Sequence, residues 1–427
     1  MVKMPHWPIP YGEPEIDENL QRMKSLLAAI GNPQNNLPKI IHIAGTNGKG
    51  SVAAFIKTIL SSANFKVHSY TSPHISRFNE RINLNGKEID DGFLYEVIEK
   101  VRINCPDNLR PTFFEATTAA AFLAFSQVPA DFIIVECGMG GMLDATNVFD
   151  DIELAVITPI SPDHMEFLGN DIGEIAAHKA YIMKKNRKTI IGPQAKEALA
   201  ILKLYAVQID SPVFCYEENY DFDGDGHNLV YIDIASQNLN YYALPSLQGA
   251  HQISNASIAI AAVKNLSESI ISDEIISDAI SKTIWPGRLE LITSGKLVDI
   301  LGTDSELWID GAHNIGGAFA MSIWMKEMPD DKSNILIVGK TAKKDQKPFL
   351  RQFKNIADKV FAVKVEGEPK SEEAQIVTNA AIEVGLNCEK AEDLLDAISK
   401  ISLISGKKRV LICGSLYLQN DLKKYNI

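Results

Sequence analysis

The sequence contains few cysteines, and no two of them are closely spaced. The chain has 427 residues, and its five cysteines are scattered along it, at Cys105, Cys137, Cys215, Cys388 and Cys413. An odd number at these spacings argues against a disulfide framework and against a structural zinc site. The sequence also lacks an apolar run of transmembrane length and an N-terminal signal core. We therefore expect a cytoplasmic protein that does not associate with membranes.

Positive charge is also scarce. The 42 Lys and Arg residues are outnumbered by 54 Asp and Glu residues, so the formal net charge is −12. This balance argues against nucleic-acid partners and anionic membrane surfaces, although a local phosphate-binding loop remains compatible with it. Hydrophobic residues make up 46% of the chain and charged residues 22%, as in ordinary globular proteins. Single cores split beyond about 250–300 residues, so the length predicts two domains.

One glycine-rich segment, residues 40–51 (IIHIAGTNGKGS), has the pattern of a phosphate-binding loop. An apolar run of strand length precedes the loop, and an apolar helical stretch follows it. Glycines let the backbone approach an anion, and the N-terminus of the following helix faces that anion with its positive dipole end. Lys49 supplies a point charge, and Ser51 supplies a hydroxyl that can bind Mg²⁺.

The loop departs from the Walker A pattern, because Gly50 separates Lys49 from Ser51 and only two residues separate Gly45 from Gly48. A glycine-rich turn without function is the alternative. Three glycines, a lysine and a serine between a buried strand and a helix argue against that alternative. The string GTNGKGS resembles the Mur-ligase superfamily of ATP-dependent acid–amino-acid ligases.

Further segments narrow this resemblance to the bifunctional dihydrofolate synthase/folylpolyglutamate synthase family. They are SPHxxxFNERI at 72–82, GMGGxLDATN at 138–147, WPGR at 285–288 and DGAHN at 310–314. They occur in the family's order and cover the whole chain. The sequence departs from the family at Met142, where the usual residue is arginine.

The resemblance implies a nucleotide site drawn from both halves of the chain. The residues it assigns to ATP are Asn47, Gly48, Lys49, Gly50, Ser51, Asn255, Arg288 and Asp310. From the residues alone, Asn255 is a polar residue near a helix start. The residues that the resemblance makes catalytic are Lys49, Lys179, Asp310 and His313.

Glu136 is a candidate metal ligand on its own evidence, because it ends an apolar strand that follows the phosphate loop in the sequence. A strand-end carboxylate that faces water is the alternative. The resemblance implies two Mg²⁺ ions with the ligands Ser51, Ser72, Glu136, His164 and carbamylated Lys179. Chemistry alone favours oxygen over histidine for Mg²⁺, and an ordinary lysine with a pKa near 10.4 is rarely neutral enough to react with CO₂.

The resemblance also implies a pterin site at Thr112, Phe114, Asp144 and Ala145. Thr112 precedes an alanine-rich helix, so a helix cap is the alternative reading of that residue.

The predicted fold class is α/β, with two domains. Residues 1–287 form an N-terminal domain with a P-loop-type, mostly parallel sheet, flanking helices and a β-hairpin excursion at 220–243. Residues 288–427 form a Rossmann-like C-terminal domain, because strand and helix patterns alternate there. The WPGR segment breaks a helical pattern and marks the boundary.

The resemblance implies an ATP-dependent ligase that joins L-glutamate to dihydropteroate and extends folates with further glutamates through an acyl phosphate. It also suggests a monomer. A folylpolyglutamate synthase without the first activity is one alternative. A peptidoglycan Mur ligase is another, although those enzymes carry a further N-terminal domain and only 44 residues precede Gly45. A P-loop kinase or motor ATPase and a non-catalytic nucleotide-gated protein are the remaining alternatives.

Overall fold

The chain folds into two compact units, which we describe separately. The computed structural model describes residues 20–268, 270–341 and 345–426. Within these ranges the first unit holds the residues up to Ser246 together with Ile253–Thr283, and the second holds Leu247–Gln252 and the residues from Ile284 onward. The first nineteen residues of the predicted N-terminal domain lie outside the described part. The domain assignment to 1–287 and 288–427 stays a prediction.

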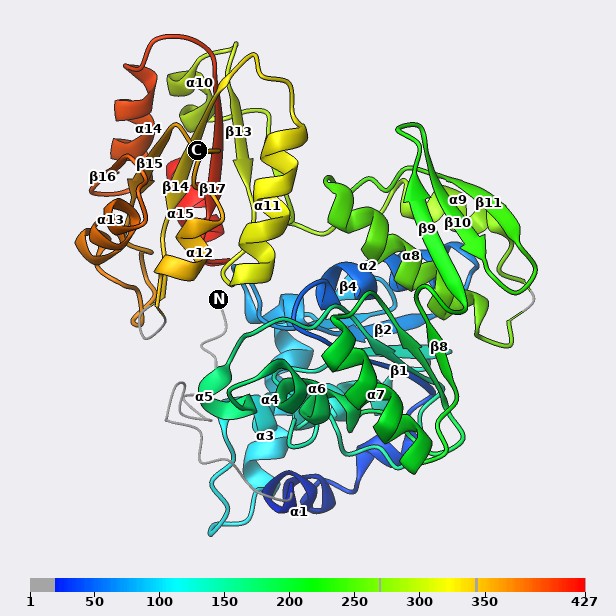
Figure 1. The fold of residues 1–427 in the computed structure, drawn as a ribbon. Coiled ribbons are helices and arrows are strands. Elements are labelled where there is room, and N and C mark those ends of the chain that lie inside the picture. The colour runs from blue at the N-terminus through cyan, green and yellow to red at the C-terminus, as the bar shows by residue number, and fades with distance from the viewer. Residues whose placement is uncertain (1–19, 269, 342–344, 427) are drawn as a thin grey trace. The chain divides into compact units, whose positions relative to one another are not determined.

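The first unit is built on an eight-stranded sheet with the order β4-β3-β2-β5-β1-β6-β7-β8 (Figure 1). The central strand β1 (Lys39–Ala44) lies between β5 (Phe132–Glu136) and β6 (Leu154–Ile157). The other strands are β2 (Val67–Tyr70), β3 (Ile82–Leu84), β4 (Lys87–Glu88), β7 (Lys188–Ile191) and β8 (Val213–Cys215). All neighbours pair in parallel except β2 with β3 and β3 with β4.

Helices cover both faces of this sheet. Side chains of alternate strand residues, such as Ile40, Val135 and Ile157, share one core with α1, α3, α4, α6 and α7. Helix α2, whose apolar residues are buried, packs on β1, β2 and β5 and against α9. The helices of this unit are α1 (Gln21–Ala29), η1 (Pro33–Asn36), α2 (Lys49–Ser62), η2 (Phe78–Arg81), α3 (Asp91–Asn104), α4 (Phe113–Gln127), α5 (Met165–Leu168), α6 (Ile172–Ala180), α7 (Lys196–Gln208) and α9 (Asp273–Ile280). Helix α8 (Ala250–Lys264) begins in the second unit and continues in the first.

The predicted hairpin at 220–243 is instead a three-stranded antiparallel sheet. Its strands are β9 (Tyr220–Gly224), β10 (Asn228–Asp233) and β11 (Asn238–Ala243), with β10 in the middle. The prediction was wrong by one strand because the segment contains two turns, at 225–227 and 234–237, and not one. Helix α9 packs against β11, which attaches this small sheet to the unit.

The second unit is a doubly wound six-stranded sheet with the order β12-β13-β17-β14-β15-β16. Its strands are β12 (Glu290–Ile292), β13 (Glu306–Ile309), β14 (Ser333–Val338), β15 (Lys359–Ala362), β16 (Cys388–Lys390) and β17 (Lys408–Cys413). Only β12 runs antiparallel to its neighbour. Its helices are α10 (Lys296–Leu301), α11 (Ile315–Glu327), α12 (Lys347–Arg351), α13 (Ala374–Glu383), α14 (Leu394–Ser402) and α15 (Leu418–Tyr425). Helices α11, α12 and α13 share one core and α10, α14 and α15 another, as expected for two covered faces.

The predicted α/β fold class, with a mostly parallel sheet in each half, is confirmed. None of the described helices has the length and apolarity needed to cross a membrane. In the first unit the chain passes from β5 on one side of β1 to β6 on the other side. Ligands of open parallel sheets bind at the carboxyl ends of the strands where this reversal occurs. A ligand site is therefore expected among the residues that follow β1, β5 and β6.

Candidate active site

The glycine loop after β1 has a conformation that requires glycine at two positions. Gly45 and Gly48 adopt φ values of +148° and +86°, and a Cβ atom at either position would collide with a neighbouring side chain. At Gly45 that neighbour is Thr158, and at Gly48 it is Asn255. The structure therefore brings Asn255, from α8, against the loop. The first N–H groups of α2 lack acceptors within their own helix, so this end of α2 can receive an anion.

The segment after β6 holds the loop in place. The N–H groups of Thr46 and Asn47 donate to the carbonyl oxygen of Pro159, at 3.0 and 3.2 Å. The Asn47 side-chain amide donates to Ser161 Oγ at 2.9 Å, and the Thr46 hydroxyl donates to the Ser161 carbonyl oxygen at 3.0 Å. These bonds fix the loop to a rigid strand end, which preorganises it for a ligand.

Lys49 lies between the loop and the end of β5. Its Nζ atom donates to the carbonyl oxygens of Gly45 and Thr46 at 3.2 Å each, and it lies 4.0 Å from Glu136 Oε1. Glu136 is buried and also accepts from the backbone N–H of Ser72, at 3.3 Å. Ser51 is buried in the first turn of α2. The candidate residues Lys49, Glu136 and Ser72 are therefore brought together at the carboxyl edge of the sheet.

Lys179 reaches the same loop from α6. It is 4% exposed, and its Nζ atom donates to the carbonyl oxygen of Gly45 at 2.9 Å. Burial, and next the positive charge of Lys49, lower the pKa of Lys179 to about 7. Lys179 is therefore not an ordinary helix-surface lysine. Gly141 packs on α6 at this point, where a Cβ atom would lie 2.6 Å from the His178 carbonyl oxygen.

His164 and its neighbour Asp163 follow β6. His164 precedes α5 with φ of +51°, and its N–H donates to Asp163 Oδ1 at 2.9 Å. Asp163 is buried, and its negative charge acts on Lys179. Sequence reasoning missed Asp163, which lies beside His164 in the loop after β6 and not at the strand end itself.

The predicted metal set contains only two residues of the usual ligand types. Among the residues that the structure describes, no three His, Cys, Asp or Glu side chains are grouped as metal ligands. Glu136 and His164 would therefore need the serine hydroxyls and a carbamate on Lys179 to complete an oxygen-rich set. A carboxylate and hydroxyl oxygens are the donors that Mg²⁺ prefers.

Two of the predicted pterin residues meet at the loop after β5. Phe114 lies against Gly138, where a Cβ atom would be 2.5 Å from its ring, and Gly138 adjoins Met139, whose N–H donates to Asp144 Oδ2 at 2.7 Å. Asp144 and Ala145 are both 5% exposed. Burial raises the pKa of Asp144, while its hydrogen bonds oppose that shift. Thr112 caps α4 by accepting from the Glu115 N–H at 3.2 Å, so the helix-cap reading of Thr112 holds in the structure.

The second unit places Asp310 at the carboxyl end of β13. Its two carboxylate oxygens accept from the N–H groups of Leu289 and Ala312, each at 2.7 Å. Arg288 lies against Gly311, where a Cβ atom would be 2.6 Å from Arg288 Nη1. His313 Nδ1 bonds the Gly311 carbonyl oxygen at 3.0 Å. The three residues predicted for this half therefore occupy one edge of its sheet.

Two further residues of this edge were missed from the sequence. Lys340, which follows β14, is 3% exposed and donates to the His313 carbonyl oxygen at 2.6 Å. His251 is partly buried beside the charges of Asp310 and Arg288, and loss of contact with water lowers its pKa. The position of Lys340 two residues after a buried strand was a usable signal, whereas His251 required the tertiary fold.

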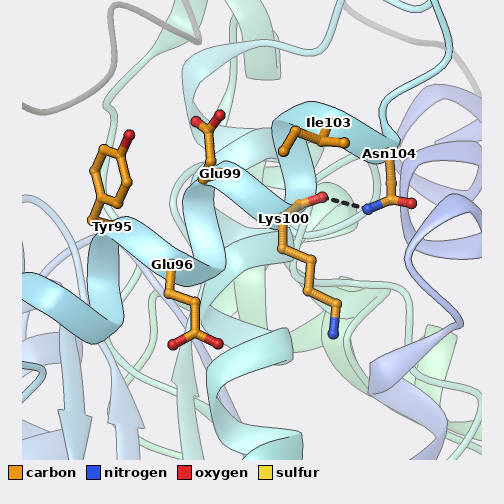
Figure 2. Close-up of a pocket in the computed structure, with 6 residues that line it drawn as sticks. All are labelled: Tyr95, Glu96, Glu99, Lys100, Ile103 and Asn104. Atoms are coloured by element: carbon orange, nitrogen blue, oxygen red, sulfur yellow. Dashed lines mark hydrogen bonds between the residues drawn. The ribbon is translucent and has the colours of Figure 1, made fainter.

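A surface hollow lies elsewhere in the first unit. It follows the exposed side of α3 and is lined by Tyr95, Glu96, Glu99, Lys100, Ile103 and Asn104 (Figure 2). None of the predicted site residues lines it. The Asn104 amide donates to the Lys100 carbonyl oxygen within it at 2.8 Å, so its polar groups partly satisfy one another.

Comparison with known proteins first identifies the class of protein to which the chain belongs. Residues 43–263 match the Mur ligase middle domain and residues 295–425 match the dihydrofolate synthetase C-terminal domain. The chain therefore belongs to the Mur ligase family, and within it to the dihydrofolate synthase/folylpolyglutamate synthase group.

The similarity extends over nearly the whole chain. The dihydrofolate synthase/folylpolyglutamate synthase of Bacillus subtilis is 33% identical, over 96% of this chain and 95% of its own. A probable dihydrofolate synthetase of Schizosaccharomyces pombe is 34% identical, over 96% and 98%. The solved structure of Escherichia coli FolC with DHPP and ADP is 26% identical, with a TM-score of 0.86 over 97% of this chain and 94% of that one. The Mycobacterium tuberculosis folylpolyglutamate synthase with ADP and AMPPCP is 28% identical, with a TM-score of 0.83 and 95% coverage of both chains.

Proposed function

We propose that this protein is an ATP-dependent ligase that joins L-glutamate to dihydropteroate, forming dihydrofolate, and that adds further glutamates to folates. The observation that carries the proposal is the convergence of Lys49, Lys179 and Glu136 on the glycine loop after β1. Membership of the family supports the choice of substrates, because relatives over the whole chain bear the names of both activities. ADP in two similar solved structures supports the nucleotide.

The chemistry requires activation of a carboxylate, because its oxygen is a poor leaving group. Transfer of the γ-phosphoryl group of ATP to the carboxylate of dihydropteroate gives an acyl phosphate. The glutamate amine then attacks that carbonyl carbon, and phosphate leaves from the tetrahedral intermediate. Phosphoryl transfer depends mainly on positioning and charge stabilisation, which Lys49 and the N-terminus of α2 supply here.

The nucleotide is assigned to Asn47, Gly48, Lys49, Gly50, Ser51 and Asn255 of the first unit, and to Arg288 and Asp310 of the second. The contact between Gly48 and Asn255 supports the first group. The hydrogen bonds that fix Asp310 beside Arg288 support the second group. His313 is assigned a catalytic role at the same edge.

We assign the acceptor's pterin to Thr112, Phe114, Asp144 and Ala145. The packing of Phe114 on Gly138, next to the bond between Met139 and Asp144, supports this grouping. An aromatic ring and a buried carboxylate can stack on a pterin and accept from its N–H groups.

The residues also fit a divalent metal site, which we propose holds two Mg²⁺ ions. Ser51, Ser72, Glu136, His164 and Lys179 as its carbamate would hold them, since Glu136 and the hydroxyls are hard oxygen donors. The pKa of Lys179 near 7 leaves much of that amine neutral, as reaction with CO₂ requires. When bound, the ions would neutralise charge on the transferred phosphoryl group.

The proposal is tested by measuring ADP release from the purified protein with ATP, dihydropteroate and L-glutamate. Release should depend on both acceptors and should fall at least about 100-fold in Lys49→Ala, as expected when one group that stabilises developing charge is removed. Release that is no faster with both acceptors than with ATP alone would refute the ligase assignment. Nucleotide binding without turnover, in the wild-type protein as well as in Lys49→Ala, would favour the non-catalytic nucleotide-gated protein.

A single activity is the second candidate, because the Schizosaccharomyces pombe relative is named only as a probable dihydrofolate synthetase and the Lacticaseibacillus casei relative only as a folylpolyglutamate synthase. Turnover with dihydropteroate and with tetrahydrofolate, measured side by side, separates these cases. We further propose a cytoplasmic monomer. We also propose that it has no nucleic-acid or membrane partners, because its net charge of −12 disfavours binding to anionic surfaces. Light scattering of the purified protein tests the monomer.

A further inference from the structure

A buried chain of polar side chains runs from the central strand to the predicted pterin site. His42 lies in the middle of β1 and is fully buried, as is Thr146 in the loop after β5. His42 Nε2 lies 2.9 Å from Thr146 Oγ1, which lies 2.5 Å from Asp144 Oδ1. No part of the predicted reaction accounts for His42 or Thr146.

The protons of this chain can be assigned from the contacts. Asp144 accepts from backbone N–H groups at both oxygens, from Thr146 at 3.0 Å and from Met139 at 2.7 Å. These donors favour the ionised carboxylate, so the Thr146 hydroxyl donates its one proton to Asp144. Thr146 Oγ1 then presents a lone pair to His42 Nε2 at 2.9 Å, and this contact is a hydrogen bond when the proton of His42 is on Nε2.

The other ring nitrogen supports this assignment. His42 Nδ1 is buried and has no hydrogen-bond partner among the described residues. A proton there would be a buried N–H without an acceptor, and such donors are rarer and more costly than an unpartnered lone pair. The tautomer protonated at Nε2 leaves only the lone pair unpaired.

The ring of His42 is also held in one orientation. Phe149 packs on it edge to face with a centroid distance of 5.7 Å, and Cys137 Sγ lies 3.1 Å from Nε2. Burial, and next the charge of Lys184, lower the pKa of His42 to about 3. The ring therefore stays neutral at physiological pH and acts as a fixed hydrogen-bond donor.

We propose that His42 and Thr146 are positioning residues that orient Asp144 as an acceptor for the pterin ring of the acid substrate. This inference rests on the proposed function. The pterin presents adjacent N–H donors on its pyrimidinone edge, which a fixed carboxylate can accept. A rotated Asp144 would also release the Met139 N–H and loosen the loop on which Phe114 packs.

The test compares Thr146→Val, which keeps the shape and removes the hydroxyl, with Thr146→Ser, which keeps the hydroxyl. We expect T146V to raise the KM for dihydropteroate about tenfold, while the KM values for ATP and glutamate change less than twofold. T146S should restore most of the affinity. Thr378→Val removes another buried hydroxyl, which bonds within α13, and controls for a general loss of stability. An unchanged KM for dihydropteroate in T146V, or an equal rise for all three substrates, would overturn the proposal.

A second readout does not depend on turnover. In ¹⁵N-histidine NMR spectra, His42 should carry its proton on Nε2 throughout the neutral pH range, and T146V should shift that resonance. His42→Gln identifies the signal by its loss. A proton on Nδ1 would overturn the proposal even if the enzyme is active. If wild type shows no turnover with dihydropteroate, the proposed function fails, and direct titration of dihydropteroate into wild type and T146V then decides whether this chain of residues supports binding.

Discussion

The Nζ atom of Lys179 lies 2.9 Å from the carbonyl oxygen of Gly45, so a buried amine from α6 contacts the first residue of the glycine loop after β1. Two roles are compatible with this position. The lysine either contributes a cation or, as the family resemblance implies, a carbamate that binds metal. The two roles respond differently to substitution, because arginine keeps the charge but cannot be carbamylated.

We predict that Lys179→Arg and Lys179→Gln both lose turnover by about 10²–10³-fold, the range found when one charge-stabilising group is removed. Steady-state ADP release measures this loss, and thermal unfolding checks the fold. Wild-type activity should also fall in CO₂-depleted buffer and return with bicarbonate. Retention of more than half of the activity in K179R would contradict the carbamate and favour the simple cation.

The contact between Gly48 and Asn255 predicts a loss of nucleotide affinity in Gly48→Ala. The added methyl group would collide with the Asn255 side chain, and the φ of +86° is unfavourable for alanine. We expect the Kd for ATP, measured by calorimetry, to rise at least about tenfold. The matched control is Gly86→Ala, since Gly86 has a φ of +87° and no atoms within 4 Å of the added Cβ position.

G86A should lower the free energy of unfolding by about 1 kcal/mol, as G48A does through strain alone, but leave the Kd for ATP unchanged. The double variant Gly48→Ala/Asn255→Ala removes the collision while losing the amide. The rise in the Kd for ATP of this double variant should be smaller than the product of the rises in the two single variants. Additive effects would show that Asn255 does not limit the space at Gly48.

Lys49→Met tests the point charge of the loop without removing its bulk. We predict a fall in kcat of about 10²–10³-fold, with a smaller rise in the Kd for ADP than for ATP, because the charge acts mainly on the transferred phosphoryl group. Rapid-quench measurements follow the fall in turnover, and calorimetry gives the Kd values for ADP and ATP. The control is Lys185→Ala, whose side chain is 70% exposed and pairs with an exposed aspartate. Equal effects on ADP and ATP binding would place Lys49 away from the γ-phosphate.

Local sequence was sufficient for the strand, glycine loop and helix at 39–62 and for most of the sheets. The apolar run of β1, the glycines and the apolar residues of α2 are contiguous, so their pattern needs no tertiary information. The same holds for Glu136, which the sequence places at the end of a strand. The third strand at 238–243 was missed because its alternation of apolar and polar residues is weak and turn residues precede it.

Contacts between distant segments could not be predicted in the same way. The chain from His42 to Asp144 depends on the parallel register of β1 and β5, in which His42 pairs with Val135. Nothing near His42 in the sequence indicates that register, so the residue reads as part of an apolar strand. His251 was missed for the same reason, since its charged neighbours Asp310 and Arg288 are distant in the sequence.

The last prediction concerns Asp421 on α15, away from the residues assigned to catalysis. Burial raises the pKa of Asp421 to about 7, and the negative charges of Glu366 and Asp393 act in the same direction. The Glu366 N–H, which donates to Asp421 Oδ2 at 3.1 Å, and Lys424 oppose the shift. An ordinary aspartate in the unfolded chain titrates near 3.9.

Between these two values the folded state binds more protons than the unfolded state, so this group makes the protein less stable as the pH rises from about 4 to about 7. Asp421→Asn removes that penalty and keeps an oxygen for the Glu366 N–H. We therefore predict that D421N raises the free energy of unfolding of the second unit by about 1–3 kcal/mol at pH 8, with the gain vanishing near pH 4. Urea unfolding at several pH values measures this difference. Asp331→Asn is the control, because Lys332 lowers the pKa of Asp331 and the substitution should give no gain at pH 8. A gain in D421N that does not depend on pH would show that Asp421 is ionised in the folded protein throughout this range.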